Sequence, residues 1–292
     1  MINFVKPVNI WYGDIMSSFI EPIGKHLTSF FVSETSRDSC VNVHFFNEGS
    51  YVKQVGLKGI NVIIPHGLAD KRYRDSKENI FQYSLASSEL WKSRLVNRGI
   101  KEEKIFIGGY AKIDTLLNNK KDTSDKKTIL WSPTHNINLK NLFGISSFPY
   151  FNEFINMIPD KYNVNISAHP YNKIDHKATI NELVNADVVI SDFSSIIFES
   201  LAIGKPVIFP DWIVRKAILS YYSGTFEGYM YLNDIGYHAN SIEELVNYID
   251  IALNNGIDEK TKDFIEEILP TKFRGSSGKT IADFLVNLDI YD

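Results

Sequence analysis

The chain has 292 residues, of which 44% are hydrophobic and 23% are charged, and its formal net charge is −4. This composition supplies enough apolar material for a core and excludes wholesale disorder, while a single cysteine, Cys40, excludes an internal disulfide and a cysteine-cluster metal site. The first residues lack a signal-peptide pattern, and no apolar run approaches the ~18 residues of a membrane span. We therefore expect a soluble protein of a reducing compartment with no integral membrane segment.

Short β-branched runs alternate with segments of helical period along the first half of the chain. A helix is predicted over Glu89–Asn97, because Leu90, Arg94 and Leu95 recur at helical spacing and Gly99 then ends it. Strand, helix and strand in this order are typical of a parallel α/β sheet. The predicted strands are Val8–Trp11, Val41–Phe46, Asn61–Ile64, Tyr83–Ala86 and Ile105–Ile107.

The second half repeats this alternation. Its predicted strands are Thr128–Ser132, Val164–Ala168, Val188–Ser191 and Val207–Phe209. Its predicted helices are Phe151–Met157, Ile180–Val184, Ser195–Ala202 and Ile242–Leu253. A last amphipathic helix, Lys279–Leu288, is expected to pack back onto the first half of the chain.

The stretch NNKKDTSDKK, residues 118–127, is purely polar and predicts a linker between two domains of similar size. We expect an N-terminal domain at 1–120, completed by a helix at 277–292, and a C-terminal domain at 121–276. The net charge is +5 for residues 1–127 and −9 for residues 128–292. Four basic residues follow the run IIPHG and favour either a solvated loop or a positive rim for an anionic partner. They are Lys71, Arg72, Arg74 and Lys77.

Several enzyme classes are excluded because their motifs are absent. The chain has no P-loop, no His-Glu-x-x-His zinc motif and no Gly-x-Ser-x-Gly nucleophile elbow. The pair Gly108–Gly109 is isolated and does not make a dinucleotide-binding fingerprint. No Asp-x-Asp carboxylate pair is present either, so we expect no obligatory metal ion and no cofactor.

Four segments carry candidate chemistry, each at the carboxyl end of a predicted strand, where open α/β sheets bind ligands. In the first, IIPHGLADK, His66 directly follows a strand, and an imidazole that titrates near neutrality can remove a proton from a hydroxyl. Gly67 lets a substrate approach the backbone closely, and Lys71 can pair with a phosphate. The alternative is a surface histidine at the passage from strand to loop.

Two further segments are weaker by themselves. In ILWSPTHN, Ser132 and Thr134 offer hydroxyls in a loop that Pro133 holds open, although a plain turn fits this sequence as well. In VNISAHP, His169 follows a strand and can donate to a phosphate or a leaving oxygen. The alternative for His169 is an ordinary loop histidine.

The fourth segment, ADVVISDFSSIIFESLAIGKP, carries the strongest signal. A buried strand ends at Asp192, and Ser194 and Ser195 stand at the cap and in the first turn of a helix. Unpaired backbone N–H groups and the helix dipole suit this end to a diphosphate. Glu199 lies one turn deeper, where a carboxylate can hold ribose hydroxyls. The alternative is an ordinary capped helix, with Asp192 as a second cap.

These motifs together resemble the CDP-glycerol glycerophosphotransferases of teichoic-acid and capsule assembly. The resemblance keeps the family's motif order and spans residues 66–206. The matching motifs are His66-Gly67-Leu68-Ala69-Asp70-Lys71, Gly109-Tyr110-Ala111-Lys112-Ile113-Asp114, Pro133-Thr134, His169-Pro170, and Asp192-Phe193-Ser194-Ser195 followed by Phe198-Glu199 and Lys205-Pro206.

The resemblance implies a GT-B fold, in which two Rossmann-like domains face each other across a cleft. It also implies that His66 is the base that activates an acceptor hydroxyl. His169 and the serine-capped helix would then bind a nucleotide-diphosphate donor of the CDP-linked type. We assign Ser132, Thr134, Asp192 and Glu199 to the donor site as well, and Gly67, Lys71 and Lys112 to the acceptor or its phosphates.

Two other functions stay open at this point. One is a nucleotide-sugar glycosyltransferase that acts on a glycan, a lipid carrier or a modified nucleic-acid base, which Glu199 and the basic residues after His66 favour. The other is a non-catalytic nucleotide-binding assembly protein. The acceptor is expected to bear a hydroxyl or an anion, as a polyol-phosphate chain, a glycan or a nucleic acid does. We expect a cytoplasmic location and leave peripheral contact with the inner membrane face open.

Overall fold

The computed structural model describes residues 1–6, 13–70, 77–134, 145–167 and 179–290. The chain forms two compact units. Unit 1 comprises Met1–Gly67, Arg72–Asn118 and Glu266–Asp292, and unit 2 comprises Leu68–Lys71 and Asn119–Ile265. The roles of acceptor-binding and donor-binding domain that we expect for the two halves stay a prediction.

Unit 1 is built on a six-stranded sheet in which every pair of neighbouring strands is parallel. Parallel strands need crossover connections, and their carboxyl ends therefore lie at one edge of the sheet. The strand order is β2 (Phe30–Ser33), β1 (Ile2–Val5), β3 (Val41–His44), β4 (Ile60–Ile63), β5 (Tyr83–Ala86) and β6 (Ile105–Ile107).

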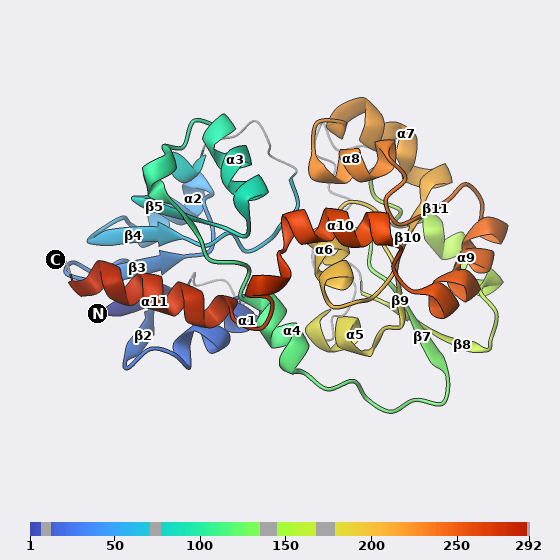
Figure 1. Ribbon diagram of the computed structural model, residues 1–292, viewed down its shortest axis with the longest axis horizontal. Helices are drawn as coiled ribbons and strands as arrows, with labels where there is room; N and C mark the ends of the chain where they lie inside the picture. Colours follow the sequence, from blue (N-terminus) through green and yellow to red (C-terminus); the bar gives the residue numbers. More distant parts are fainter. Residues whose placement is uncertain (7–12, 71–76, 135–144, 168–178, 291–292) are drawn as a thin grey trace. The chain divides into compact units, whose positions relative to one another are not determined.

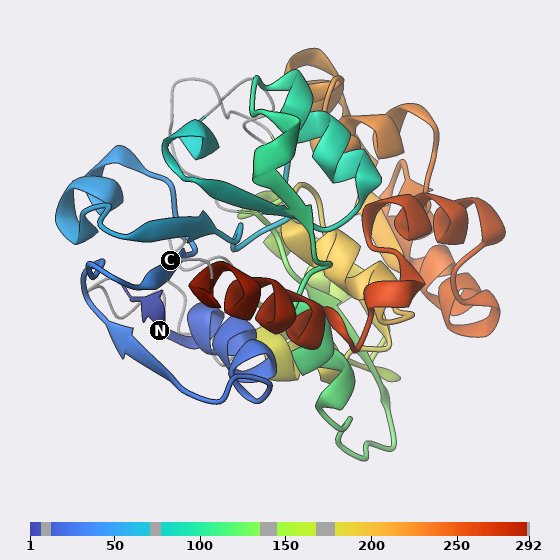
Figure 2. The ribbon, with the colours of Figure 1, turned by 60° about the vertical axis from the view of Figure 1, so that its left-hand side comes forward.

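The helices of unit 1 include one from the far end of the sequence. α11 packs against α1 and α4 and reaches β1 and β3 of the sheet. Figures 1 and 2 both show α11 lying along α1. The α-helices are α1 (Gly13–Gly24), α2 (Gly49–Val55), α3 (Glu89–Asn97), α4 (Lys112–Asn118) and α11 (Ser277–Ile290), and the 3₁₀ turns are η2 (Lys77–Ile80), η3 (Glu102–Lys104) and η7 (Thr271–Phe273).

A buried polar network lies inside unit 1. The His44 ring sits between the Tyr51 hydroxyl, 3.0 Å from Nδ1, and the Asn61 Oδ1 atom, 2.8 Å from Nε2. Asn61 Nδ2 donates to the carbonyls of Lys58 and Gly59, so its Oδ1 atom is the acceptor of the His44 Nε2–H. Burial lowers the pKa of His44 to about 4, against the partial compensation of the Asn61 hydrogen bond. His44 is therefore neutral in the folded chain at neutral pH.

Unit 2 is built on a five-stranded parallel sheet. Its central strands are buried on both faces and read as continuous apolar runs, as parallel sheets covered by helices do. The strand order is β11 (Tyr237–Ala239), β10 (Val207–Pro210), β9 (Val188–Ile190), β7 (Lys127–Trp131) and β8 (Tyr162–Ile166).

The core of unit 2 forms where α9 packs on β9, β10 and β11. Leu245 and Ile249 of α9 are fully buried there together with Trp131 and Phe151. The helices are α5 (Thr179–Asn185), α6 (Ser195–Ala202), α7 (Asp211–Tyr222), α8 (Phe226–Leu232), α9 (Ile242–Asn255) and α10 (Glu259–Ile268), whose last three residues belong to unit 1, and the 3₁₀ turns are η4 (Tyr150–Glu153) and η5 (Ile155–Met157).

One predicted element is wrong and another lies outside the described residues. The helix expected at Phe151–Met157 consists of two 3₁₀ turns, held by bonds from Phe154 N–H to the Phe151 carbonyl and from Met157 N–H to the Phe154 carbonyl. Pro149 and Pro159 bound this segment, and Phe151 packs in the core with its ring centroid 4.9 Å from that of Trp131, so tertiary packing overrides the local helical pattern. The strand expected at Val8–Trp11 falls in residues 7–12, which the structure does not describe.

Candidate functional site

Ser195, the first residue of α6, is the most exposed residue of that helix. β9 ends at Ile190, and α6 begins at Ser195 after the cap residue Ser194, whose backbone is extended (φ −152°, ψ 162°). The helix is buried from Ile196 to Ala202, whereas Ser194 and Ser195 are only half-buried. Because the sheet and its neighbours fix the body of α6, its amino end is held rigidly.

The Ser194 hydroxyl is committed to the protein. The Ser191 hydroxyl donates to the Ser132 carbonyl at 2.7 Å, so it can only accept from Ser194, whose Oγ atom lies 3.1 Å away. The Ser132 hydroxyl in turn donates to the Ser167 carbonyl at 3.1 Å. The hydrogens of these three hydroxyls therefore point to protein acceptors, although the donor-site roles expected for Ser132 and Ser194 stay predictions.

The Ser195 hydroxyl is arranged differently. Its Oγ atom accepts from the backbone N–H groups of Leu68, at 2.8 Å, and Ala69, at 3.1 Å. A serine hydroxyl has two lone pairs and one hydrogen, so both lone pairs are occupied and the hydrogen is left to donate. No acceptor for this hydrogen is present among the residues that the structure describes. Half-buried at the amino end of α6, Ser195 is suited to donate to an anionic oxygen.

Asp192 is fully buried and joins two loops. Its carboxylate accepts from the N–H groups of Thr134 (2.7 Å), Ser147 (2.6 Å) and Phe193 (2.7 Å), and from the Ser147 hydroxyl (2.8 Å). Burial raises the pKa of Asp192, while these hydrogen bonds act in the opposite direction. The carboxylate caps no turn of α6 and instead fixes the residues after β7 to those after β9.

Thr134 and Glu199 lie in the interior of the same unit. The side chain of Thr134 is 1% exposed, and its carbonyl accepts from the Ser146 hydroxyl at 2.8 Å. Glu199, one turn after Ser195, is also 1% exposed. The ribose contact expected for Glu199 and the donor-site role expected for Thr134 stay predictions.

Two acidic residues to which no role was assigned, Asp70 in the first matched motif and Glu227, hold the segment after Gly67. The Asp70 N–H donates to both carboxylate oxygens of Glu227, at 3.2 and 3.3 Å, and the Phe226 N–H donates to Asp70 Oδ2 at 3.3 Å. Both acidic side chains are fully buried. The signal for Glu227 is a carboxylate in the otherwise apolar and aromatic helix FEGYMYL, α8. Together with Ser195, this contact fixes Leu68–Asp70 to unit 2.

His66 lies in unit 1, three residues after the end of β4. Its Nδ1 atom is 2.8 Å from the Phe45 carbonyl oxygen, which can only accept, so the proton of the neutral ring sits on Nδ1. The lone pair is then on Nε2, as general-base catalysis requires. The His66 ring also packs on Phe46, with centroids 4.4 Å apart, and its carbonyl accepts from the Tyr110 hydroxyl at 3.1 Å.

Of the other residues expected to contact the acceptor, the structure describes Gly67 and Lys112 but not Lys71. Lys112 is the first residue of α4 and is half-buried, and Gly67 follows His66 in a half-buried stretch. Lys71 and His169 lie outside the described residues, as do Arg72 and Arg74. All of these expected roles stay predictions.

The part of the chain that the structure describes holds neither a metal-binding cluster nor a membrane-spanning helix. No group of three or more His, Cys, Asp or Glu side chains in that part of the chain is arranged to hold a metal ion. In the same residues, no helix combines the length and the apolar character that crossing a bilayer requires.

The two units, each built on a parallel sheet, can be compared with the folds of solved structures. The chain is similar to a variant of the wall teichoic acid polymerase TagF, with a TM-score of 0.72 at 15% identity over 100% of this chain and 89% of that one. It is also similar to the UDP-GlcNAc 2-epimerase of Methanocaldococcus jannaschii, with a TM-score of 0.54 at 15% identity over 98% of this chain and 99% of that one. The fold is of the GT-B class, as predicted.

The sequence places the chain within that class. The family model described as CDP-Glycerol:Poly(glycerophosphate) glycerophosphotransferase matches residues 27–214, which is more than half of the chain. The teichoic acid glycerol-phosphate primase of Bacillus subtilis (strain 168) is 24% identical over 98% of this chain and 77% of its own length. The chain belongs to the CDP-glycerol:poly(glycerophosphate) glycerophosphotransferase family, which confirms the resemblance seen in its motifs.

Proposed function

We propose that this enzyme transfers glycerol phosphate from CDP-glycerol to a hydroxyl group at the end of a polyol-phosphate chain. In this proposal His66 is the general base, and Ser195 donates to the diphosphate of the donor. The observation that carries it is the bond from His66 Nδ1–H to the Phe45 carbonyl at 2.8 Å, which leaves the lone pair on Nε2. Membership of the family supports the donor.

Similar proteins support the same donor and acceptor. One TagF structure similar to this chain, with a TM-score of 0.69, was determined after a soak with CDPG. The similar primase of Bacillus subtilis is a teichoic acid glycerol-phosphate enzyme by name. The family description names a poly(glycerophosphate), and TagF is a polymerase by name, so we choose a polyol-phosphate acceptor over a glycan or a nucleic acid. Cytoplasmic location and peripheral membrane association stay predictions.

The proposed reaction is a single displacement at phosphorus. The acceptor oxygen attacks the phosphorus that bears glycerol, and a new P–O bond forms while the bond to the bridging oxygen of the diphosphate breaks. His66 Nε2 takes the proton of the acceptor hydroxyl, and CMP leaves with the electron pair of the broken bond. General-base assistance of this kind contributes roughly 10²- to 10⁴-fold to a rate.

The amino end of α6 is suited to the charge that develops on the leaving group. The helix dipole and the N–H groups of its first turn favour an anion, and the Ser195 hydroxyl adds a donor whose hydrogen is not used by any described residue. Stabilisation by oriented donors needs no reorganisation during the reaction. His169, which lies outside the described residues, is proposed as a second donor to the departing phosphate.

The test is the variant His66→Gln. Glutamine cannot take a proton at neutral pH, so we expect turnover of CDP-glycerol with a polyol-phosphate acceptor to fall by about 10²- to 10⁴-fold. Binding of CDP-glycerol, measured by thermal shift, should stay within about twofold, because the donor residues are in unit 2. Turnover at the wild-type rate would rule out His66 as the base.

The matched control is His26→Gln, which changes an exposed histidine of the same unit. We expect this variant to keep wild-type turnover. A parallel thermal-shift comparison of CDP-glycerol with a UDP-sugar tests the donor, since stabilisation by the UDP-sugar alone would favour sugar transfer instead.

A further inference from the structure

The matched motif at residues 109–114 forms a loop and the first turn of α4, and Lys112 is its one residue to which a role has been assigned. This segment follows β6 and leads into α4, and it contacts two other parts of unit 1. One is the backbone of His66, and the other is the start of α11 together with the turn before it. Its contacts therefore bear on how the proposed base is held.

Tyr110 is fixed by three separate contacts. Its hydroxyl donates to the His66 carbonyl at 3.1 Å, its backbone N–H donates to the Ser277 hydroxyl at 3.0 Å, and its ring meets Phe19 edge-on with centroids 5.1 Å apart. The side chain is 4% exposed. A tyrosine held at its backbone, its ring and its hydroxyl has little freedom, and so it can hold its partner firmly.

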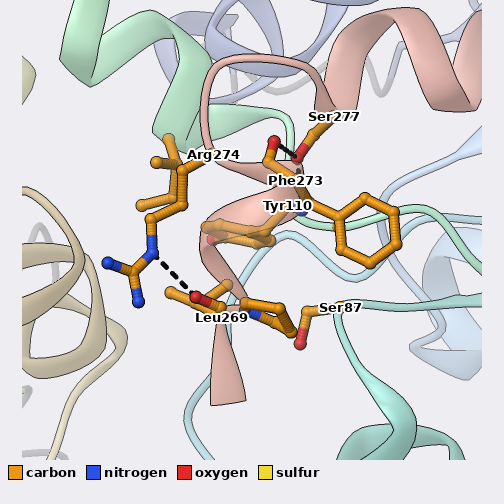
Figure 3. A pocket seen from close by; sticks show the side chains of 9 residues that line it. Ser87, Tyr110, Leu269, Phe273, Arg274 and Ser277 are labelled. Atoms are coloured by element: carbon orange, nitrogen blue, oxygen red, sulfur yellow. Dashed lines mark hydrogen bonds between the residues drawn. The ribbon is translucent and has the colours of Figure 1, made fainter. Parts of the chain in front are cut away.

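The C-terminal segment packs closely on the same motif. The Ser277 hydroxyl accepts from Tyr110 and donates to the Phe273 carbonyl at 2.8 Å, an arrangement that Figure 3 shows beside the Tyr110 ring. Gly109 has a φ of +79°, and a Cβ atom there would lie 2.3 Å from Ser277 Oγ and 2.6 Å from Phe273 Cβ, so these two side chains leave no room for one at Gly109.

Asp114 completes this attachment. Its carboxylate accepts from the N–H groups of Gly275, at 2.8 Å, and Gly278, at 2.7 Å. The side chain is 1% exposed. The motif thus joins residues 273–278, at the far end of the sequence, to the strand-end loop that carries His66.

We propose that Tyr110 is a positioning residue for the base, and that the C-terminal segment 273–278 sets the position of Tyr110. The ring of His66 is fixed at Nδ1 by the Phe45 carbonyl, and its backbone is fixed by the Tyr110 hydroxyl. With the backbone and one ring nitrogen both held, the direction of Nε2 is determined. The inference rests on the proposed role of His66, because a positioning residue matters only if the positioned ring reacts.

The test is Tyr110→Phe, which removes one oxygen and keeps the ring on Phe19. We expect kcat to fall about tenfold, because small misplacements of a reacting group are costly, while KM for CDP-glycerol and the unfolding temperature stay near wild type. The control is Tyr83→Phe, in β5 of the same unit, whose hydroxyl bonds to no described residue. It should keep the wild-type kcat.

A second variant, Ser277→Ala, tests the connection to the C-terminal segment. We expect it to lower kcat in the same direction, and the double variant with Tyr110→Phe to lower kcat by less than the product of the two single effects. If Tyr110→Phe does not fold, Ser277→Ala with its own kcat and KM decides the question by itself.

The outcomes separate this inference from the proposed function. A wild-type kcat in Tyr110→Phe, with His66→Gln inactive, would overturn the positioning role and leave the base in place. Wild-type turnover in His66→Gln would remove the base itself. A loss of activity in Tyr110→Phe that only follows loss of folded protein, with unchanged turnover per folded molecule, would also overturn the inference.

Discussion

Three serines within five residues have different hydrogen-bonding capacities, although their sequence context looks alike. The Ser194 hydroxyl donates to the Ser191 hydroxyl, which donates to the Ser132 carbonyl. Ser195 instead accepts two backbone N–H groups and keeps its hydrogen. The sequence correctly placed serines at the cap and first turn of a helix, but the allocation of each hydrogen depends on partners about 60 to 130 residues away, which no local pattern reveals.

This difference predicts unequal effects of two alanine substitutions. We expect Ser195→Ala to raise KM for CDP-glycerol about 10- to 100-fold, since a hydrogen bond to a charged group is worth roughly 1.5–3 kcal/mol. Ser194→Ala should change KM by only a few-fold, because its hydroxyl faces Ser191. Steady-state kinetics of the two variants check this, and equal KM values would contradict it.

The buried His44 predicts a pH dependence of stability. In the unfolded chain His44 has its ordinary pKa of 6.5. In the folded chain burial lowers the pKa of His44 to about 4, so the ring takes up a proton only at a lower pH. The unfolded state therefore binds more protons between these two values, and stability falls as the pH falls through that window. The contribution amounts to about 3 kcal/mol across the whole window.

The measurement is the unfolding free energy from urea titrations at several pH values. In His44→Gln, which cannot titrate, the free energy should fall less steeply between pH 6.5 and 4 than in the wild type. The control is the exposed His26→Gln, for which we expect the wild-type slope. If the unfolding free energy of His44→Gln changed with pH as steeply as that of the wild type, the buried ring would not be the cause of the loss of stability between pH 6.5 and 4.

At the scale of elements, strongly patterned segments were predicted well. Tyr83–Ala86, Glu89–Asn97 and Ser195–Ala202 have the predicted bounds, because buried strands and capped helices carry their signals locally. The segment Phe151–Met157 has apolar residues at helical spacing, yet Phe151 is drawn into the core beside Trp131. Tertiary packing and the flanking prolines there override the local preference.

Other elements lacked a decisive local signal and were not predicted. β2, for example, is an edge strand whose side chains alternate between exposed and half-buried, and it spans only Phe30–Ser33. α10 has an apolar face but is rich in charged residues over Glu259–Ile268. In the site, the contact of Asp70 with Glu227 joins residues 157 positions apart, which a single sequence does not show.

The Asp192 carboxylate joins the loops after β7 and β9, and this predicts a large effect of a small change. In Asp192→Asn, an NH₂ group replaces an oxygen that accepts from the protein, so a buried donor meets another donor. We expect the unfolding free energy to fall by about 1–3 kcal/mol or more. Calorimetry against the exposed control Asp263→Asn checks this, and matching unfolding temperatures would contradict it.

At the scale of the whole molecule, the chain passes between the units four times. It enters unit 2 briefly at Leu68–Lys71, returns to unit 1, leaves again after Asn118 and comes back at Glu266. The crossing after Asn118 falls in the polar stretch 118–127, whose role as a linker stays a prediction. The short passage that begins at Leu68 has no such signal in the sequence, because the backbone N–H groups of Leu68, Ala69 and Asp70 hold it and its composition does not change.

The return of the chain predicts that unit 1 depends on its last helix. Leu285 of α11 is fully buried, so Leu285→Ala should lower the stability of unit 1 by about 2–5 kcal/mol. Hydrogen exchange should then speed up in α1 and α4, which contact α11. The exposed control is Val286→Ala, at 38% exposure, for which little change is expected. Unchanged exchange in α1 after Leu285→Ala would contradict this dependence.

The arrangement around Ser195 also limits the chemistry of inhibitors. An oxygen whose lone pairs are both occupied offers only a proton, so a ligand atom placed there must be a pure acceptor. Sulfonates and phosphonates satisfy this demand, whereas a sulfonamide or hydroxamate that presents its own hydrogen would meet repulsion. Screening for compounds that compete with the donor should therefore enrich groups without hydrogens at that position.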